Sequence, residues 1–146
     1  MIKTFRGKLE DSEQEKIRLS TKNGKIGYQF KKLVIIGNTP GDATSEGVVK
    51  FFKVEQSTVD ALVDFSDHNL LAVGYWEDGS TAGYTGTLNI MFEKEIFNQD
   101  IYVTLKNTEG SVAMNYYIEL EAMPLTDNAA AVSTLRDIRL NPQVGA

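Results

Sequence analysis

Three carboxylates at outward-facing positions of predicted strands could form a catalytic or metal-binding site. Asp100 has the outward parity of a predicted strand over residues 100–106, and Glu119 and Glu121 have the outward parity of a second strand over residues 113–123, since successive strand side chains face opposite sides. Carboxylates on one face of adjacent strands could hold calcium or serve a glycoside hydrolase. Acidic residues also line most exposed strands. We therefore predict a solvated outer face here and no reaction centre.

His68 is the only histidine, and Ser66 and Asp67 precede it. Sequence neighbours do not make a triad, which is a spatial arrangement, and no Gly-x-Ser-x-Gly motif accompanies them. The chain has no cysteine, which excludes disulfides, zinc–thiolate sites and thiol catalysis. With one histidine, only carboxylates remain as further metal ligands. We predict a non-enzymatic protein with no metal and no cofactor.

Three aromatic residues, Tyr75, Trp76 and Tyr84, flank a glycine-rich loop over residues 77–86. Exposed aromatic rings at a loop could stack on a sugar, as in a carbohydrate-binding module. They could also anchor a protein interface, where Tyr and Trp are enriched. The third interpretation is that Trp76 fills the core, as large aromatic side chains commonly do.

Two further features predict contacts with other molecules. The strand over residues 48–54, VVKFFKV, places Phe51 and Phe52 on opposite faces, which is typical of a central strand or of an oligomer contact. In the strand over residues 25–37 the apolar parity changes at Lys31 and Lys32. A one-residue bulge there would return the apolar residues to one face; the alternative is burial of residues 34–36 on both faces. The candidate interface residues are Phe51, Phe52, Tyr75, Trp76, Tyr84, Lys31 and Lys32.

The net charge of −5 is unevenly distributed along the 146 residues. Residues 1–32 contain nine Lys/Arg and four Asp/Glu, a net of +5, which leaves a net of −10 for the remainder. Nucleic-acid-binding domains are usually basic overall, so we expect the basic segment to face solvent or an acidic protein. No apolar run approaches the roughly 18 residues of a membrane span, and the first residues lack the apolar core of a secretory signal.

The predicted elements indicate a mainly β domain. Two runs, over residues 2–9 and 15–20, form an N-terminal hairpin, and residues 100–106 and 113–123 form a central hairpin around a glycine-containing loop. In the strand over residues 87–92, Leu88, Ile90 and Phe92 point inward. One C-terminal helix spans residues 126–140. About eight short strands predict a single antiparallel β-sandwich over residues 1–146, with a jelly roll as first choice.

Three stretches carry a family resemblance: FRGKLEDSEQEKIRLSTKNGKIGYQFKKLVIIGNTPG, FNQDIYVT and NYYIELEAMPL, at residues 5–41, 97–104 and 115–125. Together they resemble small, poorly characterised virion-associated proteins of marine bacteriophages. The resemblance implies a virion structural role, as a coat, decoration or surface-appendage subunit. It carries over no catalytic motif and no functional residues.

The leading hypothesis is therefore a structural protein of a phage virion that assembles through contacts with copies of itself and with other virion proteins. The second hypothesis is a carbohydrate-binding module for adsorption to a host-surface glycan, and it depends on Tyr75, Trp76 and Tyr84. The third is a hydrolase that uses Glu119, Glu121 or Asp100. A deep cavity lined by ionisable groups would contradict the first hypothesis.

Overall fold

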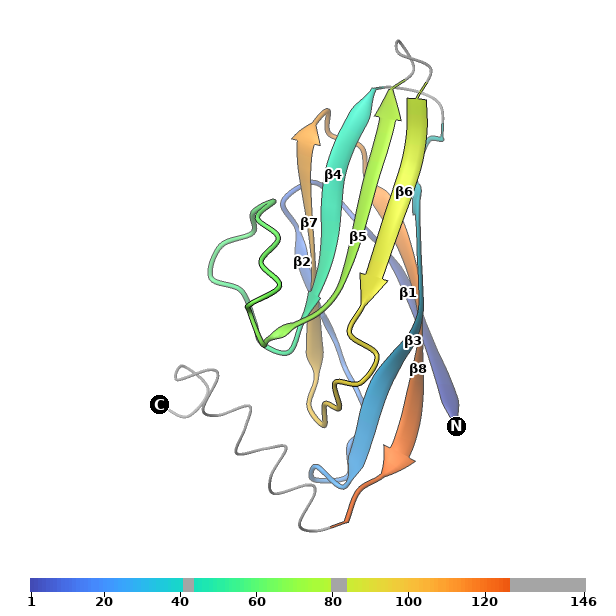
Figure 1. The fold of residues 1–146 in the computed structure, drawn as a ribbon, viewed down its shortest axis with the longest axis vertical. Coiled ribbons are helices and arrows are strands. Elements are labelled where there is room, and N and C mark those ends of the chain that lie inside the picture. The colour runs from blue at the N-terminus through green and yellow to red at the C-terminus, as the bar shows by residue number, and fades with distance from the viewer. Residues whose placement is uncertain (41–43, 80–83, 127–146) are drawn as a thin grey trace.

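Two antiparallel β-sheets pack face to face as a β-sandwich (Figure 1). The computed structural model describes residues 1–40, 44–79 and 84–126. Every predicted strand is present, with its ends shifted by no more than three residues. The strands are β1 (Ile2–Leu9), β2 (Gln14–Ile17), β3 (Ile26–Gly37), β4 (Ser45–Phe52), β5 (Leu70–Gly79), β6 (Tyr84–Met91), β7 (Ile101–Glu109) and β8 (Met114–Pro124).

The strand order places the two strands of each predicted hairpin in different sheets. One sheet has the order β1-β8-β3 and the other β2-β7-β4-β5-β6. β1 pairs with β8 and β2 with β7, so the predicted N-terminal hairpin is wrong, and so is the central hairpin of β7 with β8. In both cases the connection crosses from one sheet to the other. Alternation fixes which face of a strand is buried but not which strand it pairs with. Two consecutive strands bury their apolar faces equally well as neighbours in one sheet or on opposite sheets across the core.

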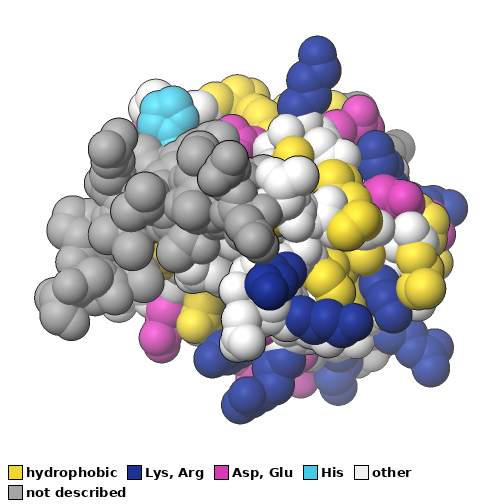
Figure 2. All heavy atoms as spheres, turned by 90° about the horizontal axis from the view of Figure 1, so that it is seen from below, with side chains coloured by type: hydrophobic (Ala, Val, Ile, Leu, Met, Phe, Trp, Pro, Cys, Tyr) yellow, Lys and Arg dark blue, Asp and Glu magenta, His cyan; other side chains and the backbone are white. Residues whose placement is uncertain are grey.

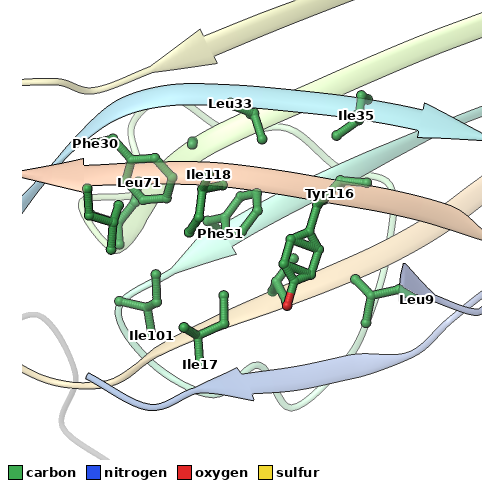
Figure 3. Close-up of a cluster of buried hydrophobic side chains, with 14 of the residues drawn as sticks. Leu9, Ile17, Phe30, Leu33, Ile35, Phe51, Leu71, Ile101, Tyr116 and Ile118 are labelled. Atoms are coloured by element: carbon green, nitrogen blue, oxygen red, sulfur yellow. The ribbon is translucent and has the colours of Figure 1, made fainter. Parts of the chain in front are cut away.

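The main hydrophobic core lies between the sheets and draws on both of them (Figure 3). Phe30 of β3 meets Phe51 of β4 edge to face at 5.3 Å, and Phe51 meets Tyr116 of β8 at 5.6 Å. Phe30 and Phe51 are fully buried, and burying such a side chain contributes about 1.5–3 kcal/mol. Pairs of this geometry add about 0.5–1.5 kcal/mol each.

A β-bulge at Lys31 confirms one of the two interpretations of β3. Phe30 pairs with Leu120 and Lys32 pairs with Glu119, so Lys31 is the extra residue. The bulge keeps Leu33 and Ile35 buried, at 4% and 6% exposure, on the same side as Phe30. The alternative of two-sided burial is wrong, because the intervening positions 34 and 36 are exposed.

The middle strand of the larger sheet is buried on both faces. Phe51 faces the main core, whereas Phe52 belongs to a second cluster on the outer side, with Val48, Leu70 and Val73. Residues 53–69 form an irregular segment that contributes Ala61 to the cover of this cluster. The central-strand interpretation of the VVKFFKV segment is therefore confirmed.

The edge strand β6 differs from its prediction. Leu88 lies opposite Tyr75 of β5 and its side chain is 58% exposed, so the inward orientation predicted for it is wrong. Leu88 lies on the side of the sheet that faces away from the main core, and the second cluster does not extend to it. Phe92 follows the strand and packs on the second cluster.

The predicted C-terminal helix over residues 126–140 lies outside the described residues except for Thr126, and residues 1–40, 44–79 and 84–126 contain no helix. Within those same ranges, no helix is long and apolar enough to cross a membrane.

Candidate functional site

The structure separates Asp100 from Glu119 and Glu121, the other two carboxylates considered as a reaction centre, and each of the three has a partner of its own. Asp100 precedes β7 and accepts a hydrogen bond from the Leu19 amide at 2.7 Å. Glu119 and Glu121 belong to β8 in the other sheet. Glu119 accepts a hydrogen bond from the Tyr117 hydroxyl at 2.7 Å, and Glu121 pairs with the N-terminal ammonium at 3.0 Å. Asp100 thus has a structural role at the edge of the larger sheet.

His68 is exposed in the irregular segment over residues 53–69. Its neighbours bond within this segment, since Ser66 donates to Asp64 and Asp67 accepts from the Asn69 amide at 2.9 Å. Across the described parts of the chain, no three acidic or histidine side chains lie close enough together to hold a metal ion.

The three candidate aromatic residues have separate positions. Trp76 is 4% exposed, and its indole N–H donates to Ser45 Oγ at 3.1 Å, so it fills the core. The Tyr75 hydroxyl donates to Glu46 at 2.9 Å and lies 3.4 Å from Glu77. The hydrogen bond to Glu46, with burial and the negative charge of both carboxylates, raises the pKa of Tyr75 to about 12. Tyr84 begins β6, and its side chain lies outside the described part.

The other candidate interface residues divide by burial. Phe51 and Phe52 are 0% and 4% exposed, so neither lies on the surface of this chain. Lys31 and Lys32 are exposed. Figure 2 looks up at the end of the sandwich where β1 begins, and shows Lys and Arg side chains gathered along the margin of this end.

The outer face of the three-stranded sheet combines exposed apolar side chains with basic ones. Its outward positions form four rows across the strands, which the register defines; the first is Ile2–Glu121–Gln29. The other three rows combine apolar, aromatic and basic side chains. We name the surface that they form the basic face; its rows are Thr4–Glu119–Lys32, Arg6–Tyr117–Val34 and Lys8–Asn115–Ile36.

Two aliphatic side chains on the basic face are open to solvent. Val34 and Ile36 are 41% and 56% exposed. Neighbouring apolar residues without a cover mark interaction surfaces more often than isolated ones. Arg6 and Lys32 form no ion pair within the described residues, and Lys8 pairs only with exposed Glu10, at 3.6 Å. The surface is therefore apolar at β3 and positively charged around it.

A hollow of about 520 Å³ opens on the basic face beside Val34 and Ile36. Gly7 is among the residues that line it. A Cβ atom at Gly7 would lie 2.7 Å from the Tyr116 hydroxyl, so the glycine leaves room for this side chain. The Tyr116 side chain passes beneath Gly7, and its hydroxyl donates to Glu15 at 3.1 Å. Burial, followed by the charge of Glu15, raises the pKa of Tyr116 above its usual value, so the phenol is neutral at physiological pH.

Sequence reasoning found Lys32 on this surface but missed Arg6, Tyr117, Val34 and Ile36. For Val34 and Ile36 the signal was the bulge, which the sequence offered as one of two alternatives. Once Lys31 is taken as an extra residue, the alternation of β3 turns Val34 and Ile36 outward. Together they form one exposed apolar pair, and contiguous exposed apolar residues are a feature of interaction surfaces.

The basic face can recognise a partner, and the groups on it do not form a nucleophile–base pair. Its one carboxylate, Glu119, is held by Tyr117. Comparison with models of known protein families and with curated proteins finds no match to this chain.

Proposed function

We propose that this protein is a non-enzymatic structural protein of a phage virion, a coat, decoration or appendage subunit that works through protein–protein contacts. The observation that carries the proposal is the exposed Val34–Ile36 pair on the basic face. The assignment to a virion comes from the resemblance of residues 5–41, 97–104 and 115–125 to virion-associated phage proteins.

We also propose that the sandwich is a jelly roll, an architecture common among capsid domains. In a jelly roll, one long antiparallel hairpin is rolled up, so that the first strand lies by the last and the second by the seventh. β1–β8, β2–β7 and β4–β5 pair in this manner. The remaining two strands, β3 and β6, are neighbours across the sheets, where Asn89 Nδ2 donates to the Leu33 carbonyl at 2.9 Å.

The non-enzymatic part of the proposal is supported by the separate partners of Asp100, Glu119 and Glu121. A hydrolase of the glycosidase kind needs two carboxyl groups about 5–10 Å apart across one substrate site. Here Asp100 lies just before β7 of one sheet, while the two glutamates belong to β8 of the other. Glu119 and Glu121 share the outer face of β8, where the first accepts a hydrogen bond from Tyr117 and the second pairs with the N-terminal ammonium.

Mass spectrometry of purified virions tests the proposal. We expect peptides of this chain in particles that have been separated from host debris on a density gradient. Copy number relative to the major capsid protein then separates coat, decoration and appendage roles. Absence of the chain from purified particles, with its presence in the infected-cell lysate, would contradict a virion role.

A further inference from the structure

The basic face has a chemical counterpart on the opposite side of the same molecule. On the outer face of the five-stranded sheet, Glu46 of β4 lies in register with Glu77 of β5 and with Glu109 of β7. We name these three residues the acidic row. Leu88, 58% exposed, lies one row away, opposite Tyr75. Both sides therefore combine exposed aliphatic groups with charge, and the charges are of opposite sign.

Within the described residues, the carboxylates of the acidic row have no ion-pair partner. Directly opposed like charges on neighbouring strands destabilise a sheet. The Tyr75 hydroxyl and Thr108 Oγ1, which bonds Glu46 at 2.9 Å, are neutral. Lys106 lies on the same face, but its ammonium donates to Ser12 Oγ at 2.9 Å.

Arg6 is the cation best suited to this row. It occupies the middle row of the basic face, beside Tyr117, and within the described residues it has no carboxylate partner of its own. A guanidinium can donate to two carboxylates through a fixed planar fork. Placed between Glu46 and Glu77, it would offset their repulsion as well as its own unpaired charge.

We propose that the basic face of one molecule docks on the acidic row of a second copy, with Arg6 between Glu46 and Glu77 and with Val34 and Ile36 near Leu88. This inference rests on the proposed function, because it names the partner through which the subunit assembles. The two surfaces lie on opposite sides of the sandwich (Figure 1). The contact is therefore heterologous, and repetition of it builds a ring or a filament.

Two charge-reversed variants test the contact. The first, Arg6→Glu with Lys32→Glu, disables the basic face. The second, Glu46→Lys with Glu77→Lys, disables the acidic row. Measured by sedimentation velocity over a concentration series from micromolar to millimolar, self-association of each variant is expected to be about tenfold or more weaker than that of the unmodified chain. Association of the unmodified chain should weaken with added salt, since exposed charge pairs are screened.

Mixing the two variants gives the decisive result. The intact acidic row of the first variant can meet the intact basic face of the second, and the reversed charges of the two altered surfaces are also complementary, so an equimolar mixture should regain the association that each variant alone has lost. Arg18→Glu with Lys25→Glu changes the net charge as much as the first variant does, at exposed positions outside both surfaces, and should assemble normally. Urea denaturation of each variant shows whether it is folded.

Three results would overturn the inference: an unmodified chain that stays monomeric at millimolar concentration, folded variants that assemble as the unmodified chain does, or a mixture that does not regain association. These outcomes are distinct from failure of the proposed function. A monomeric chain found in virions keeps its virion role and loses this contact, whereas a chain absent from virions that assembles through these surfaces does the reverse.

Discussion

The Lys50 ammonium is buried beneath the segment over residues 53–69 and lies 2.9 Å from the Asp60 carboxylate. It also donates to the Leu62 carbonyl at 2.6 Å. The Lys50 side chain is 5% exposed, whereas that of Asp60 is 53% exposed. This ion pair fastens an irregular segment over the second apolar cluster, so the middle of the larger sheet is covered by the chain itself.

Asp60→Asn should destabilise the protein by about 1–3 kcal/mol, because the buried ammonium would lose its counter-charge and keep only neutral acceptors. The exposure of Asp60 favours the lower part of that range. Urea denaturation measures the change. The double variant Lys50→Met with Asp60→Asn removes the stranded charge and should be more stable than Asp60→Asn alone. Equal stability of the two would contradict the account of Lys50.

Acid should remove the stabilisation that Asp60 provides. The hydrogen bond from Lys50 lowers the pKa of Asp60 below its ordinary value of 3.8. A carboxyl whose pKa is lower in the folded state stabilises the protein above the unfolded value, and the effect disappears as pH falls through the folded value. The difference in unfolding free energy between the unmodified chain and Asp60→Asn should thus be constant near neutrality and shrink below about pH 4. A difference that is independent of pH would contradict this.

Gly47→Ala should be strongly destabilising. A Cβ atom at this position would lie 2.4 Å from the Trp76 ring and 2.6 Å from the Lys106 carbonyl oxygen, and the backbone oxygen cannot swing away. Overpacking of this kind costs about 1–3 kcal/mol. Gly37→Ala is the matched control, since its closest contact would be 3.6 Å. Trp76, the only tryptophan, reports both transitions by fluorescence, and equal midpoints would contradict the prediction.

Glu46→Gln should lower the pKa of Tyr75 from about 12 toward its ordinary value of 10, because the hydrogen bond to Glu46 is the main cause of the increase. An amide oxygen accepts a weaker hydrogen bond than a carboxylate and carries no charge, so both contributions of Glu46 to the pKa decrease. Selective labelling of tyrosine and an NMR titration follow the Tyr75 ring. Glu119→Gln, which alters the partner of Tyr117 on the other sheet, should leave Tyr75 unchanged. A Tyr75 titration that is unaffected by Glu46→Gln would contradict the assigned cause.

Deletion of Lys31 should be tolerated, whereas deletion of Val34 should not. Without Lys31 the bulge is lost, but Phe30, Leu33 and Ile35 keep the same side of the sheet, so the cost should be about 1–2 kcal/mol. Without Val34, the one-residue shift turns the preceding or following part of β3 to the wrong face. Circular dichroism and urea denaturation measure both. A folded Val34 deletion of normal stability would contradict the assigned register.

The strands and their buried faces were predictable because alternation is a local property of the chain. In β8 the buried residues Met114, Tyr116, Ile118 and Leu120 are those that the sequence pattern marks. The bulge at Lys31 was also predictable, since one extra residue in a strand shifts the apolar parity of everything that follows it. The exposure of Leu88 was not predictable, because alternation shows which residues share a face of a strand but not whether another element covers that face.

Local pattern thus determined that the chain forms eight short strands, roughly where they lie and, for most of them, which side chains face the core. The tertiary structure alone decided which strands pair, and with them both surfaces. The basic face needs β1, β8 and β3, and the acidic row needs β7, β4 and β5. Residues from distant parts of the chain, such as Arg6, Val34 and Tyr117, become neighbours only through hydrogen bonds between strands. Any two strands can form these bonds, so their sequences do not specify the partner.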